Sequence, residues 1–595
     1  MKTPMPLIAT FLAVGVIHLH AATITVTGTA DGGAGTLRNA LASAADGDTI
    51  DATSVSGTIL LTSGELLVTN SVDIIGPGPD WLAVNGNFPN TTNRVFHIGS
   101  NTLVSIASLT VTNGYAPGFD GGGGIYNDHA TLTVTNCTLS GNRADTCCGG
   151  SGGGIFNESG TLIVNNSTLN GNSANQNGGG IDNFFGTLTV QSSTLGGNSA
   201  SNNSGGAINS ESGTVVISNC TLSGNSASYG GALVILGYDE GPDGTFISTS
   251  TIQSSTLSSN TAGYGGAIEN GCAMTISDCT LSGNSASGNG GGIWNLITLT
   301  VINSTLSSNS ADHGGGIYNE GVFGTNDVSI NNSTLSGNRA RGAGGAILNF
   351  GSLSIQSSTL SGNSATNGGA IFGGAAEIGS TILNAGASGG NFKNSVGTVT
   401  SLGYNLSSDD GGGFLTATGD QINTDPLLGP LQDNGGPTFT HALLCGSPAI
   451  DQGKNFSASA TDQRGAGFAR TFDDPTVANA TGGDGTDIGA FEVQQGDCAA
   501  QDTDGDGVAD AIDQCPGTPP GAIVDASGCS LAQLVPCDGP LSGGAWKNHG
   551  QYVSAVVHAA TDFLKARLIT RRQWVEIVAD AAQSKCGWNR RFDHD

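Results

Sequence analysis

Polar and apolar residues alternate along much of this chain in short runs that recur at a nearly fixed interval. In Thr131-Leu132-Thr133-Val134 every second side chain falls on one face, which is the pattern of a half-buried β-strand. Each run follows a glycine pair and an aliphatic residue, and it precedes a motif of the type TLSGNSA. The aliphatic markers are Ile125, Ile155, Ile181, Ile208, Leu233, Ile268, Ile293, Ile317, Ile347 and Ile371. Markers this evenly spaced indicate a solenoid.

The residue types inside the blocks decide which solenoid is expected. Gly, Ser, Thr and Asn dominate, and these residues favour turns and β structure over the helices of other repeat proteins. We predict a mainly β protein, a parallel β-helix with three short strands per coil. Ile125, Leu132, Val134 and Leu139 should point inward, and glycine pairs such as Gly123-Gly124 should form corners where backbones approach closely.

One asparagine in each block is expected to stack on its counterparts in neighbouring coils. Stacked amides bond to the residues above and below them, as in other cross-β stacks. The predicted column contains Asn142, Asn172, Asn198, Asn225, Asn260, Asn284, Asn309, Asn338 and Asn363.

The chain outside the repeats divides by composition. An apolar run from Leu7 to Leu19 that ends at Ala21-Ala22 predicts a secretory signal peptide, and a membrane-anchoring helix is the alternative. No later stretch has the length of apolar sequence needed to span a bilayer. The expected segments are a signal peptide (1–22), an N-terminal cap with the first coils (23–120), the repeats (121–383), the last coils and cap (384–496), a calcium repeat (497–537) and a helical tail (538–595).

Two sets of motifs resemble known surface proteins. The GGxI blocks and Leu139-Ser140-Gly141-Asn142 resemble the repeats of right-handed β-helix surface proteins, including the polymorphic outer-membrane proteins, which have FxxN there. A second set is similar to the choice-of-anchor Q region of bacterial surface proteins. It comprises 425–428, 433–438, 446–451, 462–465 and 487–492. The resemblance implies a right-handed parallel β-helix, export and a surface role, and no reaction.

The charged residues of that second region admit two interpretations. They could form a functional site, or they could be ion pairs and turn bonds that hold the terminal coil, which is the interpretation we favour. The residues are Asp451, Asp462, Arg464, Asp487 and Glu492.

An aspartate-rich loop follows the β-helix region. Its spacing, with glycine at position 6, is that of loops that wrap oxygen ligands round a calcium ion. The expected calcium ligands are Asp502, Asp504, Asp506, Val508 through its carbonyl, Asp510 and Asp513. An acidic linker that binds nothing is the alternative. The loop and the cysteines after it resemble a thrombospondin type 3 repeat, which implies a structural calcium site and a Cys515–Cys529 disulfide.

The other cysteines and the tail give further expectations. We expect Cys537 to pair with Cys586, whereas Cys137, Cys220 and Cys279 recur several coils apart, too far to bridge one another. Cys147 and Cys148 are either a strained pair or free thiols. Residues 548–567 and 570–584 should form a helical hairpin, with a capping box from Thr570 to Gln573.

Charge and chemistry limit the possible functions. The net charge of −29 disfavours nucleic acid as a partner. A polysaccharide lyase usually needs Arg or Lys as the base that removes a proton from the sugar. Between Gly121 and Leu383 there is no Lys, and Arg occurs only at 143, 339 and 341, which disfavours a lyase. A hydrolase needs two carboxyl groups. The candidates are Asp128, Glu158, Glu211, Glu320 and the acidic loop 239–243, although solvated corner residues explain them better.

Aromatic residues in the repeats form either an exposed stripe for a glycan or protein ligand, or spaced decoration. They are Tyr126, Phe156, Phe184, Phe185, Trp294 and Tyr318. We therefore expect a secreted or cell-surface protein, structural or adhesive, monomeric and without a catalytic site. Its partner would be an extracellular glycan or surface protein. The alternative is a polysaccharide lyase or glycoside hydrolase on a β-helix scaffold.

Overall fold

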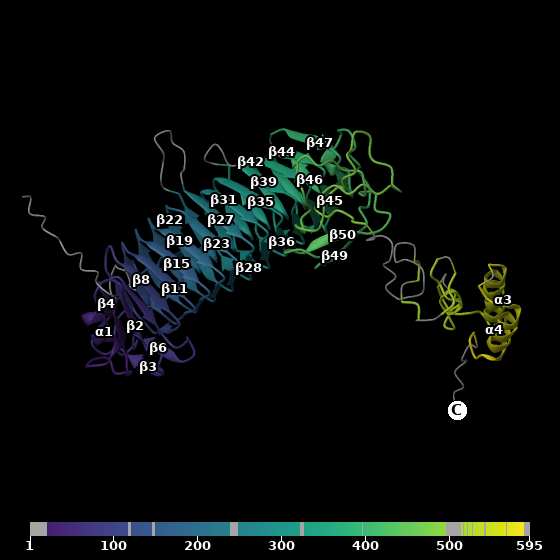
Figure 1. Cartoon of the computed structure of the whole chain (residues 1–595). Helices are drawn as coiled ribbons and strands as arrows, with labels where there is room; N and C mark the ends of the chain where they lie inside the picture. The colour runs from purple at the N-terminus through teal and green to yellow at the C-terminus, as the bar shows by residue number, and fades with distance from the viewer. Residues whose placement is uncertain are drawn as a thin grey trace, which may run out of the picture.

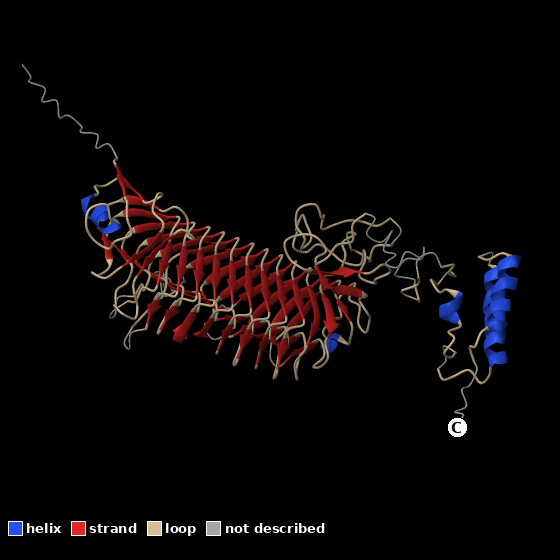
Figure 2. Cartoon of the chain, turned by 90° about the horizontal axis from the view of Figure 1, so that it is seen from below, coloured by secondary structure: helices blue, strands red, loops and turns tan. Residues whose placement is uncertain are grey.

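The computed structural model describes residues 21–587 apart from 117–120, 146–148, 238–247, 322–326, 395–396, 476, 496–512, 516, 520–521, 526, 541–542 and 567. The strands of successive coils lie side by side and form one elongated body (Figures 1 and 2). All ladders between coils are parallel within the described residues, so the chain is a parallel β-solenoid, as the alternation and the repeat period predict.

Each repeat coil crosses four stacks of strands. Stack 1 contains the strands that begin at the aliphatic markers: β4 (Leu66–Val68), β7 (Phe96–Ile98), β10 (Ile125–Asp128), β14 (Ile155–Glu158), β18 (Ile181–Phe184), β22 (Ile208–Glu211), β26 (Leu233–Leu236), β30 (Ile268–Gly271), β34 (Ile293–Asn295), β38 (Ile317–Asn319), the first parts of β42 (Ile347–Gln356) and β44 (Ile371–Gly379), and β46 (Phe392–Asn394). Stack 2 contains β1 (Thr23–Thr25), β2 (Asp48–Asp51), β5 (Val72–Ile75), β8 (Leu103–Ala107), β11 (Thr131–Thr135), β15 (Thr161–Asn165), β19 (Thr187–Gln191), β23 (Val215–Ser218), β27 (Thr249–Gln253), β31 (Ala273–Ser277), β35 (Thr298–Ile302), β39 (Asp327–Asn331), the second parts of β42 and β44, and β47 (Val399–Gly403).

Stack 3 is a 14-stranded sheet: β3 (Gly57–Leu60), β6 (Leu82–Asn85), β9 (Thr110–Thr112), β12 (Thr138–Ser140), β16 (Thr168–Asn170), β20 (Thr194–Gly196), β24 (Thr221–Ser223), β28 (Thr256–Ser258), β32 (Thr280–Ser282), β36 (Thr305–Ser307), β40 (Thr334–Ser336), β43 (Thr359–Asn363), β45 (Ile382–Ala385) and β48 (Leu406–Ser407). Stack 4 contains β13 (Arg143–Ala144), β17 (Ser173–Ala174), β21 (Ser199–Ser204), β25 (Ser226–Tyr229), β29 (Thr261–Ala262), β33 (Ser285–Ala286), β37 (Ser310–Ala311) and β41 (Arg339–Ala340). Three strands per coil were predicted; the prediction missed stack 4, whose strands are too short to show alternation.

The coils stack in a register that places equivalent residues of successive repeats above one another. Ile125 pairs with Ile155, and Leu132 pairs with Leu162. All four of these side chains are fully buried, and so is Leu139. The inward assignment made from the alternation is therefore confirmed, and the core is one continuous column of aliphatic residues. Burial of such side chains contributes roughly 1.5–3 kcal/mol each relative to exposure.

The predicted asparagine column is present at the corner between stacks 3 and 4. The amide nitrogen of Asn225 donates to the carboxamide oxygen of Asn260 at 3.0 Å, and it also donates to the backbone oxygen of Leu195. The same pattern runs through all nine expected residues, which are buried. Because each amide also accepts a backbone N–H from the coil below, the column satisfies polar groups that burial would otherwise leave unpaired.

A second asparagine column, which the prediction missed, lies at the end of the stack 1 strands. Asn127 donates to Asn157 at 2.5 Å, and Asn295 donates to Asn319 at 2.8 Å. Ser210 and Ile235 occupy the same register position and interrupt the column. The signal was in the sequence, since an asparagine stands two residues after most of the aliphatic markers.

The N-terminal end of the solenoid carries a short helix that the sequence pattern did not predict. Helix α1 (Leu37–Ser43) begins at Thr36, whose hydroxyl accepts the backbone N–H of Asn39. Its apolar side, Leu37, Ala40 and Leu41, joins the core of the first coils. Seven residues are too few for a clear helical period, and the core contact stabilises the helix instead.

The segment after the repeats does more than the expected closing of the far end. After β48 come the short helix η1 (Gly411–Gly413) and the antiparallel pair β49 (Leu428–Gln432) and β50 (Thr440–Leu443). This segment lies back along the outside of stack 3. The hydroxyl of Thr305 donates to the backbone oxygen of Phe439, and the hydroxyl of Thr334 donates to the side chain of Gln463. It therefore covers outward residues of several coils.

The C-terminal tail forms a separate helical unit. It contains α2 (Leu531–Leu534), α3 (His549–Lys565) and α4 (Arg571–Gln583). Helix α3 is capped by Asn548, and Thr570 and Gln573 form the predicted capping box of α4. The cysteine pairs Cys515–Cys529 and Cys537–Cys586 are joined as disulfides, as expected.

Candidate functional site

The outer face of stack 1 carries aromatic and acidic side chains in register from coil to coil. They occupy the position directly after the aliphatic marker, so the strand alternation points them away from the core. In order along the solenoid the residues are His97, Tyr126, Phe156, Asp182, Asn209, Val234, Glu269, Trp294, Tyr318 and Leu348. The next outward position adds Asp128, Glu158, Phe184 and Glu211.

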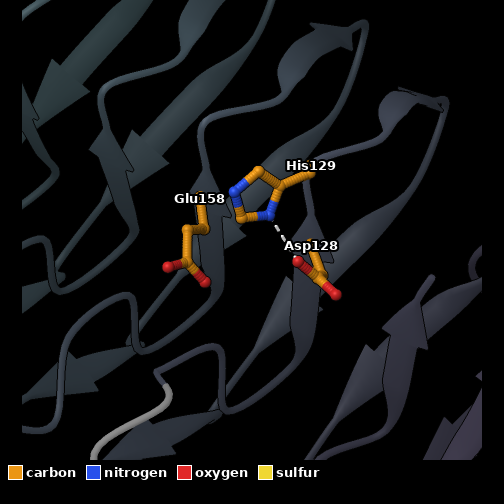
Figure 3. Close-up of side chains that lie close together, drawn as sticks. All are labelled: Asp128, His129 and Glu158. Carbon is orange, nitrogen blue, oxygen red and sulfur yellow. Dashed lines mark hydrogen bonds and ion pairs between the residues drawn. The ribbon is translucent and has the colours of Figure 1, made fainter. Parts of the chain in front are cut away.

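The first group on this face contains Asp128, His129 and Glu158, whose ligand-type atoms lie within 4.8 Å of one another. The imidazole of His129 lies between the two carboxylates (Figure 3). Each acid already has partners: Ser100 and His129 bond to Asp128, and Tyr126 donates to Glu158. Burial would raise the pKa of Asp128, but the bonds from His129 and Ser100 outweigh it and lower the pKa. These contacts account for the group without a ligand.

The rings beside this group stack on one another. The centroids of His97 and Tyr126 are 4.8 Å apart, and those of Tyr126 and Phe156 are 5.7 Å apart. The guanidinium of Arg94 lies 4.9 Å from the centre of the Tyr126 ring, and Tyr126 is buried. Since neighbouring coils already cover these ring faces, this stack does not form an open platform for a flat ligand.

Two carboxyl groups, Asp182 and Glu211, come together near the middle of the face. Asp182 is 3% exposed, and the amide of Asn209 donates to its carboxylate at 2.7 Å. Burial, with the nearby charge of Glu211, raises the pKa of Asp182 to about 7 although the Asn209 bond opposes the shift. Burial also raises the pKa of Glu211, which accepts a hydrogen bond from Asn177.

A second carboxyl pair, Glu269 and Glu320, surrounds an indole ring. Glu269 pairs in register with Trp294, and the indole N–H of Trp294 donates to the carboxylate of Glu320. Glu269 is 8% exposed. Its burial and the charge of Glu320 raise the pKa of Glu269 to about 7. Burial and Glu320 also raise the pKa of Tyr318, which is the next residue in register after Trp294.

Aromatic rings from two stacks meet beside this second pair. Tyr229 at the end of β25 and Tyr264 after β29 have centroids 5.7 Å apart, and the Trp294 centroid is 5.0 Å from that of Tyr264. A surface hollow of about 540 Å³ lies against the two tyrosines. Apart from them, its lining is small and uncharged: Asn202, Ser226, Ala227, Ser228, Thr261, Ala262, Gly263 and Ser287.

The four acidic candidates named from the sequence do share one face. The prediction described them as solvated corners, but all four are half-buried and bonded to neighbours. It missed Asp182 and Glu269, the two most buried carboxyl groups of the face. Their signal was a charged residue directly after an aliphatic marker. The acidic loop 239–243 lies outside the described residues.

The aromatic residues named from the sequence do not form one continuous stripe. Tyr126 and Phe156 belong to the group of stacked rings beside His129. The ring centroids of Phe184 and Phe185 are 4.5 Å apart, and these two rings form a separate pair. Trp294 joins the cluster with Tyr229 and Tyr264, two tyrosines that the prediction omitted because they stand before the glycine pairs of their blocks.

The charged residues of the terminal segment are buried and bonded to each other and to backbone. Arg464 pairs with Asp462 at 2.7 Å and lies between the rings of Phe468 and Phe491. The carboxylates of Asp451, Asp487 and Glu492 accept backbone N–H groups of the same segment. These contacts agree with the interpretation that the residues hold the terminal coils.

Most of the expected calcium loop lies outside the described residues, including Asp502, Asp504, Asp506, Val508 and Asp510. The described ligand candidate, Asp513, accepts the backbone N–H of Cys515 at 2.8 Å. Cys147 and Cys148 are also outside the described part of the chain. Cys137, Cys220 and Cys279 are free and buried, as expected. Among the described helices, none has the length and apolar composition to cross a membrane.

Comparison with known proteins gives limited matches. Residues 278–296 match the family described as Chlamydia polymorphic membrane protein (Chlamydia_PMP) repeat. No match was found among curated proteins. Among solved structures, the catalytic domain of a GH87 alpha-1,3-glucanase variant in complex with tetrasaccharides has a TM-score of 0.37 and 14% identity, over 64% of this chain and 69% of that chain. The same domain in complex with nigerose has a TM-score of 0.37 and 12% identity over the same shares.

Proposed function

We propose that this chain is an extracellular β-helix protein that binds glycans in a structural or adhesive role. The observation that carries the proposal is the meeting of Tyr229, Tyr264 and Trp294 beside a hollow lined by hydroxyl and amide groups. Sugars bind where apolar ring faces and small polar groups occur together, because a pyranose has both apolar C–H faces and hydroxyl edges.

The charge of the chain favours a neutral glycan. The net charge is −29, and the repeats contain only three arginines between residues 121 and 383. Acidic polysaccharides and nucleic acids would be repelled by such a surface. The hydroxyl and amide groups that line the hollow can instead exchange hydrogen bonds with neutral sugar hydroxyls.

Three observations support an extracellular location. The first residues have the pattern of a secretory leader. The two disulfides of the tail are typical of oxidising compartments. The matched repeat, finally, is by its description a repeat of a polymorphic membrane protein.

The test is a glycan array probed with the full chain and with Trp294→Ala. We expect binding to neutral glycans that falls about 2- to 10-fold in the variant, because one aromatic contact is worth roughly 0.5–1.5 kcal/mol. Trp81→Ala is the matched control, since Trp81 is 66% exposed and lies in an early coil away from the hollow. Equal binding by Trp294→Ala, or no binding to any neutral glycan, would contradict the proposal.

The aspartate loop is proposed to bind calcium and so to stiffen the link between the solenoid and the tail. Five aspartates at ligand spacing repel one another unless a cation joins them. Calcium titration of the full chain by calorimetry should give heat that Asp504→Asn abolishes and that Asp327→Asn, an exposed residue of β39, leaves unchanged. If Asp504→Asn gives the same heat of calcium binding as the wild type, the loop is not the calcium site.

A further inference from the structure

The surface hollow beside Tyr229 and Tyr264 is a local depression in stack 4. The alanine at the second position of the stack 4 strands is buried in the coils on both sides of it, with exposed fractions between 0 and 6% at Ala144, Ala174, Ala200, Ala286, Ala311 and Ala340. Its counterparts Ala227 and Ala262 are half-buried and line the hollow. Because these two alanines stand in register with the buried ones, the hollow reaches a layer that the other coils cover.

One end of the hollow is closed by a bulge in β21. The register of β21 and β25 shifts between Ala200 and Ser204, where three residues of β21 lie opposite one residue of β25. Extra residues in one strand are pushed out of the ladder. Asn202, in the middle of the bulge, is exposed and lines the hollow. Its side-chain amide donates to the carboxamide oxygen of Asn175 in the preceding coil at 2.5 Å, which holds the bulge in place.

Two tyrosine rings form a side wall of the hollow. Tyr229 and Tyr264 are bridge partners in neighbouring coils, and their ring planes are 14° apart. Trp294 packs against both rings, with centroid distances of 6.1 and 5.0 Å, and it is not among the residues that line the hollow. A side chain at Gly288 would collide with the ring of Tyr264, so this glycine leaves the space that the ring occupies. The wall is therefore fixed by its neighbours, and it runs parallel to the solenoid axis.

The opposite end of the hollow has no such bulge. Thr261 pairs with Ser285, and Ser285 pairs with Ser310, without a shift of register. Ser287 lines the hollow at this end. From Asn202 to Ser287 the lining crosses three coil spacings, which is roughly 14 Å. The hollow is thus a short trough with one closed end, one open end and one aromatic side.

This shape favours the end of a glycan chain over its interior. A polymer bound through its interior continues beyond the site in both directions, so its site must be open at both ends. A chain lying along the tyrosine wall would meet the bulge at Asn202, and a chain entering across the strands would meet the wall itself. The lining residues carry no charge and offer hydroxyl and amide groups, which suits an uncharged sugar.

We propose that the hollow binds the terminus of a neutral glycan chain, with the Asn202 bulge as the stop for the chain end and with Tyr229 and Tyr264 as the side wall. This inference rests on the proposed glycan binding and adds which part of the chain the protein recognises. Since the hollow is roughly 14 Å long, only a short terminal stretch of the chain contacts it.

The test is a length series titrated into the full chain by calorimetry. The probes are malto- and laminari-oligosaccharides and whichever neutral glycan the array identifies, each as a tetrasaccharide, a hexasaccharide and a size-fractionated soluble polymer of the same linkage. A linear chain has one end of each kind whatever its length. We therefore expect a dissociation constant per mole of chains that varies by less than about 2-fold across a series. Recognition of the interior would instead make this constant fall in proportion to the number of sugar units.

Two variants test the hollow itself. Thr261→Trp fills it from an exposed position and should weaken binding about 10-fold or more. Arg339→Trp is the matched control, because Arg339 is exposed and occupies the same register position three coils further on. Deletion of Asn202 and Asn203 removes the bulge, and it should make the dissociation constant per mole of chains depend on chain length. An unchanged constant in the folded deletion variant would overturn the role of the bulge.

The outcomes separate the two proposals. Binding that Thr261→Trp weakens, with a dissociation constant that falls in proportion to chain length, would overturn recognition of the end and leave glycan binding in the hollow standing. No binding to any neutral glycan would remove both proposals. Equal binding by Thr261→Trp and Arg339→Trp would place the glycan elsewhere and overturn this inference. If the deletion variant does not fold, the wild-type length series decides on its own.

Discussion

The side-chain amide of Asn142 donates to the carboxamide oxygen of Asn172, one coil further along the solenoid, at 3.0 Å. This bond connects two residues that are 30 positions apart, and its repetition ties every coil of the repeat region to the next. The asparagine column therefore couples the stability of neighbouring coils. Removing one asparagine from its middle should destabilise the coils on both sides of the substitution.

Asn225→Ala should lower stability strongly. The change removes the acceptor of two bonds from Asn198 and the donor of bonds to Leu195 and Asn260. Leaving these buried groups unpaired should cost on the order of 3 kcal/mol or more. Thermal melting followed by circular dichroism would measure the effect. Asn170→Ala, at an exposed position of β16, is the control and should melt like the wild type.

Arg464→Ala should lower the melting temperature of the solenoid. It leaves Asp462 as a buried charge without its partner, which typically costs about 3–5 kcal/mol. The matched control is Arg341→Ala, because Arg341 is 84% exposed and its pair with Asp312 is screened by water. A melting temperature equal to that of the control would show that Arg464 does not hold the terminal segment.

Glu492→Gln should reduce the loss of stability at high pH. Burial, with the charge of Asp487, raises the pKa of Glu492 to about 9, while Arg470 opposes the shift. A raised pKa in the folded state means that the stabilising effect is complete below the unfolded value and is lost as pH rises through the folded value. The wild-type melting temperature should therefore fall between pH 5 and 9, and the variant should fall less. If the melting temperatures of the wild type and the variant fall equally with pH, the ionisation of Glu492 is not the cause of the loss of stability.

Much of the fold was accessible from the sequence because the repeat period and the strand alternation are both local. The alternation assigns Leu132 and Val134 to the core, and the constant place of asparagine in each block predicts a column. The capping box of Thr570 is likewise local. A parallel register needs only that like residues stack, so no distant information is required.

The burial of outward residues was decided by tertiary structure alone. Thr280 and Thr305 begin the same motif, yet Thr305 is buried because the chain near Phe439 returns over its coil. Glu269 and Trp294 likewise share one strand position, and their contact arises only once two coils are stacked.

The sequence by itself determined that the chain coils, which side chains face inward and which amides align, because these follow from periods of two residues and of one block. Tertiary structure decided which outward carboxyl groups lose water and which aromatic rings meet. Those environments depend on loops and coils far away in the chain, and the pKa of Glu269 and the hollow beside Tyr264 exist only when they come together.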